Sequence, residues 1–370
     1  MINKVFIVAT LSFLLLRCES TETKPNTAMN TVSASKHQTT SAAAISPSFT
    51  NSHTRLIGRF DHTTQGQAAF TWPGSAIEFR FEGTQASINM ASQTPVRFVV
   101  NIDGKTNDLW TQAGRHSYPL AINLPKGTHN LRLTRVNEST AGITSFTSDP
   151  QVDGTLLTPA ASPQKRLLVI GDSITAGYGV EGSSATCHYA LDTSNQQLTY
   201  AALAANALGA DVHAIAWSGI GVWRSYGEKT PTNPSILIRH SRTLADDANS
   251  TWNVSQYTPD AILINIGTND YWEGSVTDDY RLAMAKLITK VQGDYAGKPI
   301  YLIVSPMLTN KLHELQKQVL NSLASSNVKV LDLGENNGAE GFGCDYHPNS
   351  ITHARLGKAL EKNLKTELNW

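Results

Sequence analysis

Residues 167–179 read LLVIGDSITAGYG, and this stretch decides the fold. The apolar run from Leu167 to Ile170 predicts a buried parallel strand, which Gly171 ends at a tight turn. Ser173 follows that turn directly. An α/β protein presents a nucleophile on such a turn at the carboxyl end of a strand, so Ser173 is a candidate nucleophile.

Strand-like and helix-like segments alternate on the carboxyl side of this stretch. The strand-like runs are 167–170, 212–216, 261–266, 299–304 and 328–332, and the helix-like segments are 198–208, 277–295, 312–325 and 352–368. Apolar strands that alternate with helices are typical of a parallel sheet covered on both faces. We therefore predict a three-layer α/β domain over residues 165–370.

Residues 50–158 show a different pattern, with short alternating runs and no helical periodicity. In the run 76–81, the side chains of Ile77, Phe79 and Phe81 fall on one face, and turn signals such as Pro73-Gly74 and Asp103-Gly104 separate such runs. This pattern predicts an antiparallel β-sandwich of jelly-roll type. The segment 159–166 reads as a linker to the α/β domain.

The first residues are typical of an export signal. Lys4 precedes an apolar run from Val5 to Leu16 that is too short to span a membrane. Cys18 follows Leu-Leu-Arg, which resembles a bacterial lipobox except at Arg17, and cleavage after Ser20 is the alternative. We expect residues 1–18 to be a signal peptide and the polar residues 19–49 to be a flexible linker. The mature chain would be periplasmic, an outer-membrane lipoprotein or extracellular. It would meet a membrane only if Cys18 carries a lipid.

Charge and cysteine content exclude other classes of protein. The net charge is zero and 16% of residues are charged, which speaks against a nucleic-acid partner. Besides Cys18 the chain has Cys187 and Cys344, which are expected to form a disulfide in an oxidising compartment, the alternative being two independent thiols. No CxxC or clustered His-Cys pattern of a zinc site appears. The covalent serine mechanism expected from the residues below requires no metal and no cofactor.

A serine nucleophile needs a base, and His347 is the candidate. It lies in the loop 341–349 before the last helix-like segment, at the sheet edge where Ser173 is expected. The alternative is a surface histidine that caps the helix. Asp345 could orient the imidazole as the third member of a triad, or a backbone carbonyl could do so instead.

The tetrahedral intermediate of acyl transfer needs donors for its oxyanion. We expect three donors: the backbone N–H of Ser173, the backbone N–H of Gly219, and the side-chain amide of Asn269. Gly219 and Asn269 each follow a predicted strand, and their alternatives are a plain turn and a helix cap. Four aromatic residues beside these blocks could stack on a sugar or pack in the core: Trp217, Trp223, Tyr271 and Trp272.

Together these blocks resemble the SGNH (GDSL-type) hydrolases. The shared blocks are GDS at 171–173, Gly219, GTND at 267–270 and the late His347. The chain more narrowly resembles carbohydrate esterase family 2, in which a β-sandwich precedes an SGNH domain. That likeness covers about residues 55–370 and rests on GRF at 58–60, WPGSAIEFRFEGT at 72–84 and GCDYHPN at 343–349. Many SGNH enzymes carry Asp three residues before the histidine; here Cys344 is there and Asp345 follows, so triad and dyad both stay open.

The resemblance implies a serine esterase that removes acetyl groups from plant-wall polysaccharides such as xylan or glucomannan, through an acyl-enzyme on Ser173. Two alternatives stay open. An SGNH esterase could act on a lysophospholipid, a thioester or O-acetylated peptidoglycan. A glycan-binding protein could use the hydrolase domain as an inactive scaffold.

Overall fold

The computed structural model describes residues 48–274 and 278–370. The predicted signal peptide 1–18 with Cys18, residues 19–47 of the predicted linker, and Thr277 in the segment 277–295 lie outside the described residues. Within the described part of the chain, no helix has both the length and the apolar character to cross a membrane.

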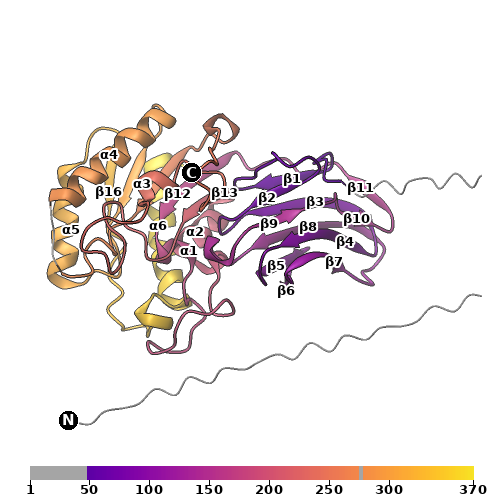
Figure 1. Ribbon diagram of the computed structural model, residues 1–370, viewed down its shortest axis with the longest axis horizontal. Helices are drawn as coiled ribbons and strands as arrows, with labels where there is room; N and C mark the ends of the chain where they lie inside the picture. The colour runs from indigo at the N-terminus through magenta and orange to yellow at the C-terminus, as the bar shows by residue number, and fades with distance from the viewer. Residues whose placement is uncertain (1–47, 275–277) are drawn as a thin grey trace, which may run out of the picture. The chain divides into compact units, whose positions relative to one another are not determined.

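The amino-terminal part is an antiparallel β-sandwich, as the alternating pattern predicts (Figure 1). Its strands are β1 (Thr54–Ile57), β2 (Ala68–Phe70), β3 (Ala76–Gly83), β4 (Ala86–Ser92), β5 (Arg97–Ile102), β6 (Lys105–Trp110), β7 (Gly114–Ala121), β8 (Gly127–Arg135), β9 (Thr144–Phe146), β10 (Gln151–Val152) and β11 (Thr155–Leu157). One sheet has the order β1-β3-β8-β5-β6, with β11 paired to β3. The facing sheet has the order β10-β4-β9-β2, with β7 paired to β4.

Alternation along the strands builds the core of the sandwich. Ile77, Phe79 and Phe81 of β3 are buried together, which confirms the predicted face. β6 gave no such signal, because this edge strand is polar and almost wholly exposed. Edge strands bury little apolar surface, so their sequences need not alternate.

The carboxyl-terminal part is a parallel α/β domain. Its strands are β12 (Lys165–Gly171), β13 (Ala210–Ala216), β14 (Ala261–Asn265), β15 (Ile300–Ile303) and β16 (Val328–Leu331). Its α-helices are α1 (Ser173–Ala176), α2 (Tyr200–Leu208), α3 (Ile236–Arg239), α4 (Asp278–Asp294), α5 (Asn310–Ser322) and α6 (Ser350–Leu368). Short 3-10 turns occur along the chain at η1 (Ser139–Ala141), η2 (Gln196–Leu198), η3 (Val254–Gln256) and η4 (Cys344–Tyr346).

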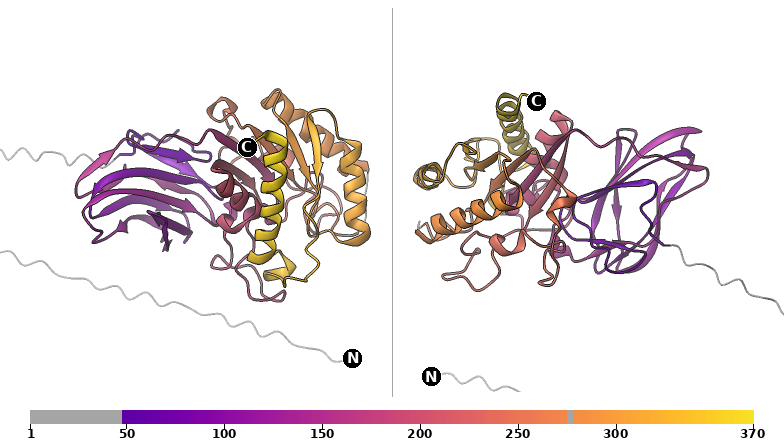
Figure 2. Two further views of the ribbon diagram at one scale, coloured as in Figure 1. Left: turned by 180° about the vertical axis from the view of Figure 1, so that it is seen from behind. Right: turned by 90° about the horizontal axis from the view of Figure 1, so that it is seen from above.

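The parallel sheet has the order β13-β12-β14-β15-β16, and helices cover both of its faces (Figure 2). Successive residues of β12 point to opposite faces, so Leu168 and Ile170 join one core while Leu167 and Val169 join the other. The first core also holds residues of α4 and α5, and the second holds residues of α2 and α6. This confirms the three-layer prediction. From β12 the chain first adds β13 on one side of it and then crosses over to add β14 on the other side. This reversal of direction makes the carboxyl end of β12 a topological switch point.

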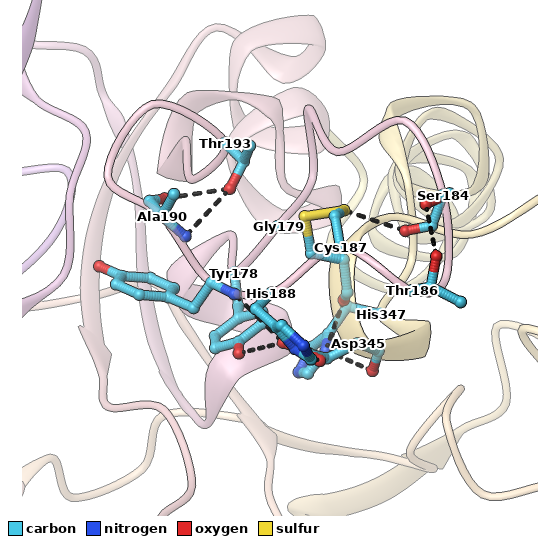
Figure 3. The surroundings of a disulfide bond; sticks show 12 residues. Tyr178, Gly179, Ser184, Thr186, Cys187, His188, Ala190, Thr193, Asp345 and His347 are labelled. Carbon is cyan, nitrogen blue, oxygen red and sulfur yellow. Dashed lines mark hydrogen bonds and ion pairs between the residues drawn. A yellow bond between two sulfur atoms is a disulfide. The ribbon is translucent and has the colours of Figure 1, made fainter.

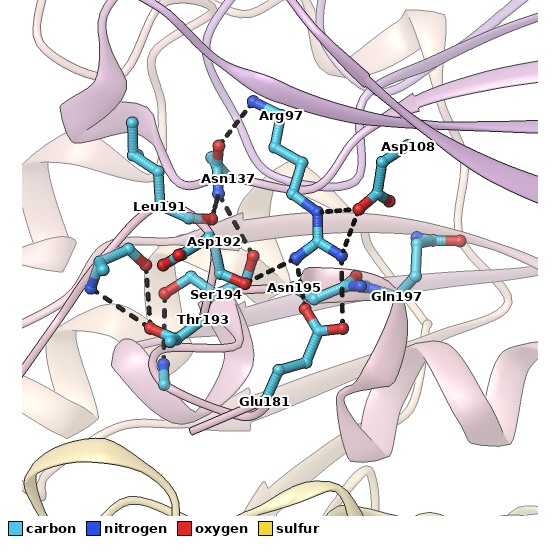
Figure 4. Close-up of polar contacts among 12 residues, drawn as sticks. Arg97, Asp108, Asn137, Glu181, Leu191, Asp192, Thr193, Ser194, Asn195 and Gln197 are labelled. Carbon is cyan, nitrogen blue, oxygen red and sulfur yellow. Dashed lines mark hydrogen bonds and ion pairs between the residues drawn. The ribbon is translucent and has the colours of Figure 1, made fainter. Parts of the chain in front are cut away.

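Polar contacts join the sandwich to the α/β domain (Figure 4). Arg97 of β5 pairs with Glu181 and also donates to the carbonyl of Asp192. Asn137 donates from its side-chain amide to the carbonyls of Leu191 and Ser194, at 2.8 and 3.2 Å. These donors come from the sandwich and their acceptors from the α/β domain, so loops of the two parts are held in register with each other.

Candidate active site

Ser173 sits at the switch point, on the turn between β12 and α1. A Cβ added to Gly171 would lie 2.2 Å from Thr175 Oγ1 and 3.0 Å from the carbonyl oxygen of Asn265, so this close turn requires glycine. Asp172 caps α1 by accepting a hydrogen bond from the Ile174 N–H at 3.0 Å. Ser173 itself is 4% exposed. The turn therefore holds the serine in one place at the carboxyl edge of the sheet.

His347 meets Ser173 across this edge. Its Nε2 lies 2.8 Å from Ser173 Oγ. Its Nδ1 lies 3.1 Å from the backbone carbonyl oxygen of Asp345 and 3.2 Å from that of Cys344. Carbonyl oxygens accept hydrogen bonds and cannot donate them, so Nδ1 carries the proton and Nε2 has a free lone pair for the serine hydroxyl. The ring also stacks on Tyr178, with 4.1 Å between the ring centroids.

The carboxylate of Asp345 turns away from the imidazole (Figure 3). It accepts hydrogen bonds from the Tyr178 hydroxyl at 2.6 Å and the Tyr189 N–H at 3.2 Å, and it lies 2.8 Å from His188 Nδ1. Asp345 and Tyr346 both have left-handed backbone angles, with φ of 50° and 61°, and this loop conformation directs a carbonyl at the ring. The expectation that the Asp345 side chain orients His347 is thus corrected: backbone carbonyls do so.

This arrangement predicts a mild effect for Asp345→Asn. We expect kcat/KM to fall about tenfold or less, against the roughly 10⁴-fold loss when a carboxylate in contact with the catalytic imidazole is replaced. Steady-state kinetics of the purified variant measures the difference. A loss near 10⁴-fold would show that the carboxylate reaches the imidazole during turnover.

The expected oxyanion donors lie on the turns after three neighbouring strands. Gly219 follows β13 with a φ of 77°, and the space where its Cβ would be is open. Asn269 follows β14, and its side-chain N–H donates to the carbonyl of Ile220 at 2.8 Å. A primary amide has two hydrogens, so the second is available to a ligand. Asp270 holds the far end of the Gly219 loop by accepting the N–H groups of Val222, Trp223 and Arg224, at 2.8–3.0 Å.

The aromatic candidates have different surroundings. Tyr271 is 2% exposed and packs edge-on against Tyr280, so it belongs to the core, and the expectation that it stacks on a sugar is corrected. Trp217, Trp223 and Trp272 are partly buried. The indole N–H of Trp272 donates to the carbonyl of Glu228 at 3.1 Å, which fixes that ring.

An exposed aromatic residue completes this group. The backbone N–H of Tyr226 donates to the carbonyl of Gly219 at 2.8 Å, and its ring centroid lies 5.7 Å from that of Trp272. Its side chain is exposed (69%), so the ring is open to a ligand beside Gly219. Sequence reasoning missed Tyr226, although it stands three residues after Trp223 in the same loop.

A groove of about 470 Å³ opens beside Trp217. Ser139, Thr140 and Gly142 of the sandwich line one part of it, and Trp217 and Asp246 of the α/β domain line another. Ile143 and Leu244 line it together with these polar groups and the Trp217 indole.

Burial sets the protonation state of the histidine. Removal from water lowers the pKa of His347 to about 4, although the carbonyls of Asp345 and Cys344 favour its charged form. The imidazole is therefore neutral above pH 4 and can accept the serine proton there.

We predict that kcat/KM is half-maximal on its acid side near pH 4. Below that pH His347 is protonated and cannot act as a base. A histidine with an ordinary pKa would already become protonated, and the activity would fall, near pH 6.5. Acetate release measured from pH 3 to 8 tests this, with intrinsic fluorescence as a control for unfolding at each pH. An acid limb centred near pH 6.5 would contradict the prediction.

A disulfide joins Cys187 to Cys344, with 4.6 Å between the Cα atoms (Figure 3). The N–H of Cys344 donates to the Gly179 carbonyl at 3.1 Å, and the N–H of Asp345 donates to the Cys187 carbonyl at 2.9 Å. The bond thus ties the loop that carries His347 to the segment that follows Ser173.

A Ser–His pair at the switch point of a doubly wound sheet, with donors on the neighbouring turns, defines the class of GDSL-type ester hydrolases. Family models agree with this class: Carbohydrate esterase 2 N-terminal matches residues 56–160, and the GDSL-like Lipase/Acylhydrolase family matches residues 169–355.

Known proteins resemble the chain across both domains. The family two carbohydrate esterase from Clostridium thermocellum, solved with cellohexaose, is 29% identical, with a TM-score of 0.82 over 86% of this chain and 99% of that chain. The carbohydrate esterase family 2 enzyme of Corynascus thermopiles (Myceliophthora fergusii) is 32% identical, with a TM-score of 0.77 over 86% and 100% of the two chains. The chain therefore belongs to carbohydrate esterase family 2, and it is a carboxylic ester hydrolase.

Curated relatives extend this picture. Cellulase/esterase CelE of Acetivibrio thermocellus is 31% identical over 85% of this chain, which spans 39% of the length of CelE. An acetylxylan esterase / glucomannan deacetylase of Cellvibrio japonicus is 26% identical over 80% of this chain and 85% of its own length.

Proposed function

We propose that this chain is a serine esterase that removes O-acetyl groups from plant cell-wall polysaccharides such as xylan or glucomannan. The observation that carries the proposal is the 2.8 Å contact between Ser173 Oγ and His347 Nε2, in a ring whose other nitrogen is held by carbonyls. This geometry supports nucleophilic attack by the serine with histidine as general base.

The reaction follows from these groups. His347 Nε2 takes the hydroxyl proton of Ser173 as Oγ attacks the acetyl carbonyl carbon. The negative charge on the former carbonyl oxygen is stabilised by the N–H groups of Ser173 and Gly219 and the amide of Asn269. The intermediate collapses to an acetyl-serine, and protonated His347 gives its proton to the departing sugar hydroxyl. A water molecule, deprotonated by His347, then attacks the ester, and acetate is released as His347 returns the proton to Ser173 Oγ.

The polymer would be held by aromatic rings beside Gly219 and by the groove beside Trp217. Tyr226 and Trp272 flank the Gly219 loop, and the groove beside Trp217 has walls from both domains. Trp223 lies in the same loop and is a further stacking candidate. The names of the Cellvibrio relative and the cellohexaose bound to the Clostridium relative support a β-linked polysaccharide.

Acetate release from acetylated xylan, acetylated glucomannan and p-nitrophenyl acetate tests the proposal, with Ser173→Ala as the matched control. We expect release from a polysaccharide that is lost in the variant. Activity on p-nitrophenyl acetate alone would favour the alternative esterase, with a lysophospholipid, a thioester or O-acetylated peptidoglycan as its substrate. Polysaccharide binding without any ester hydrolysis would instead favour an inactive scaffold.

We also propose that the chain works outside the cytoplasm, which the disulfide between Cys187 and Cys344 supports, since such bonds persist in oxidising compartments. Mass spectrometry of the mature amino terminus distinguishes a lipid-modified Cys18 from cleavage after Ser20. An intact Met1 on active protein from the native cell would contradict export through this segment.

A further inference from the structure

A buried carboxylate of the sandwich reaches the loop of residues 217–226 that carries Gly219, which we call the oxyanion loop. Glu138 is 3% exposed and precedes the short turn η1. Its Oε2 accepts a hydrogen bond from the backbone N–H of Ser218 at 2.9 Å. Ser218 directly precedes Gly219, so the sandwich contacts the α/β domain one residue away from an expected oxyanion donor.

The main chain around Glu138 is held firmly. Arg135 is fully buried, and its guanidinium donates to the carbonyls of Asn137 and Glu138 at 3.1 and 2.9 Å. Asn137 in turn donates to the carbonyls of Leu191 and Ser194 in the α/β domain. The backbone that carries the Glu138 side chain is therefore fixed by hydrogen bonds within the sandwich and by hydrogen bonds to the α/β domain.

Three side chains hold the oxyanion loop at successive points. Glu138 holds the N–H of Ser218, Asn269 holds the carbonyl of Ile220, and Asp270 holds the N–H groups of residues 222–224. The Gly219 peptide lies between the first two of these contacts. Glycine in the left-handed region has wide conformational freedom, so the direction of its N–H depends on these neighbouring contacts.

Burying a carboxylate at this position costs free energy, so we ask what the Glu138 side chain provides that an apolar side chain could not. Burial disfavours the charged form of Glu138 and raises its pKa, while the N–H and hydroxyl of Ser218, the Tyr189 hydroxyl and nearby Arg135 oppose that rise. Buried charged groups are often replaceable by packed apolar residues without loss of stability. Stability alone therefore does not explain a buried carboxylate that holds the Ser218 N–H.

We propose that Glu138 is a positioning residue for catalysis: by holding Ser218, it directs the Gly219 N–H toward the oxyanion. The sandwich is then part of the catalytic apparatus and more than a cleft wall or spacer. This inference rests on the proposed serine-esterase mechanism, but it holds for any ester cleaved through Ser173.

Three replacements of Glu138 test the contact. Glu138→Met fills the space without an acceptor, Glu138→Asp keeps the charge but is too short to reach Ser218, and Glu138→Gln keeps an acceptor oxygen at full length. Rates on p-nitrophenyl acetate are divided by the number of Ser173 sites labelled to completion by an organophosphate. In the Met and Asp variants we expect kcat/KM to fall about 10- to 100-fold, less than the 10²- to 10³-fold cost of losing an oxyanion donor itself. The Gln variant should stay within about threefold of wild type.

A transition-state mimic separates positioning from general damage. Trifluoroacetone adds to a serine as a hemiketal with an oxyanion, so its affinity should fall in the same proportion as kcat/KM in the Met and Asp variants. Arg55→Met is the matched control, because it removes a contact across the same boundary, the ion pair with Asp211, without touching Glu138 or Ser218. It should lower the unfolding temperature and leave kcat/KM per labelled site within about threefold of wild type.

Wild-type kcat/KM per labelled site in either the Met or the Asp variant would overturn the inference, so failure of one variant to fold leaves the other to decide. A fall in kcat/KM with unchanged trifluoroacetone affinity would overturn it too. If the wild-type protein cleaves p-nitrophenyl acetate but no acetylated polysaccharide, the proposed substrate is wrong. The role of Glu138 in positioning Gly219 would still be tested by the rates on p-nitrophenyl acetate.

Discussion

His347→Gln is expected to lower kcat/KM for p-nitrophenyl acetate by about 10⁴-fold or more, the scale on which serine hydrolases lose activity without their histidine. Among the described residues, His347 Nε2 is the base in contact with Ser173 Oγ, so the variant has no group there to take the serine proton or return it to the leaving group. Glutamine is close in size, so the Tyr178 stack loses a ring but leaves no large cavity. Steady-state kinetics, with circular dichroism to verify folding, measures the effect.

His188→Gln is the matched control for this variant. His188 contacts the same loop through Asp345, but its side chain is 89% exposed and it makes no described contact with Ser173. We expect its kcat/KM to stay within about threefold of wild type. Equal losses in the two histidine variants would show that the loop, and not the base, had been damaged.

Loss of the disulfide should have the largest effect on stability. We expect Cys187→Ser with Cys344→Ser to lower the free energy of unfolding by about 2–5 kcal/mol, because the bond closes a long loop in the unfolded chain. Its two half-cystines are 157 residues apart. Activity should fall as well, since Cys344 supplies a carbonyl to His347 Nδ1. Guanidinium unfolding curves followed by fluorescence measure the change.

Wild-type protein incubated with dithiothreitol offers an independent comparison. Once reduced, it should unfold at the same guanidinium concentration as the double variant. A double variant with the wild-type unfolding midpoint would contradict the prediction and show that the disulfide does not contribute to the free energy of unfolding.

The sequence reveals the parts of the site that depend on strand ends. Ser173, Gly219 and Asn269 each follow an apolar run, and parallel strands place such positions at one edge of a sheet. The histidine is found because its loop precedes the last helix at that same edge. In the structure His347 and Ser173 do lie together, in agreement with this reasoning.

Other parts of the site depend on conformation or on distant contacts, which local patterns do not encode. The direction of the Asp345 carboxylate follows from left-handed angles at two successive non-glycine residues. Tyr271 and Trp272 are neighbours in the chain, yet one is in the core and the other is partly exposed, because a turn reverses side-chain direction within one residue. Glu138 comes from another domain, and no spacing within the hydrolase blocks points to it.

Arg59 determines how this polypeptide can be divided. It belongs to the sandwich, is 2% exposed, and donates to the carbonyls of His240 and Arg242 in the α/β domain. Separating the two domains at residues 159–166 would take the Arg59 donor away from those carbonyls and expose a buried cation. When genes recombine, the two domains should therefore be transferred together, as one unit. The similarity to CelE has that form, since it covers 85% of this chain within a much longer protein.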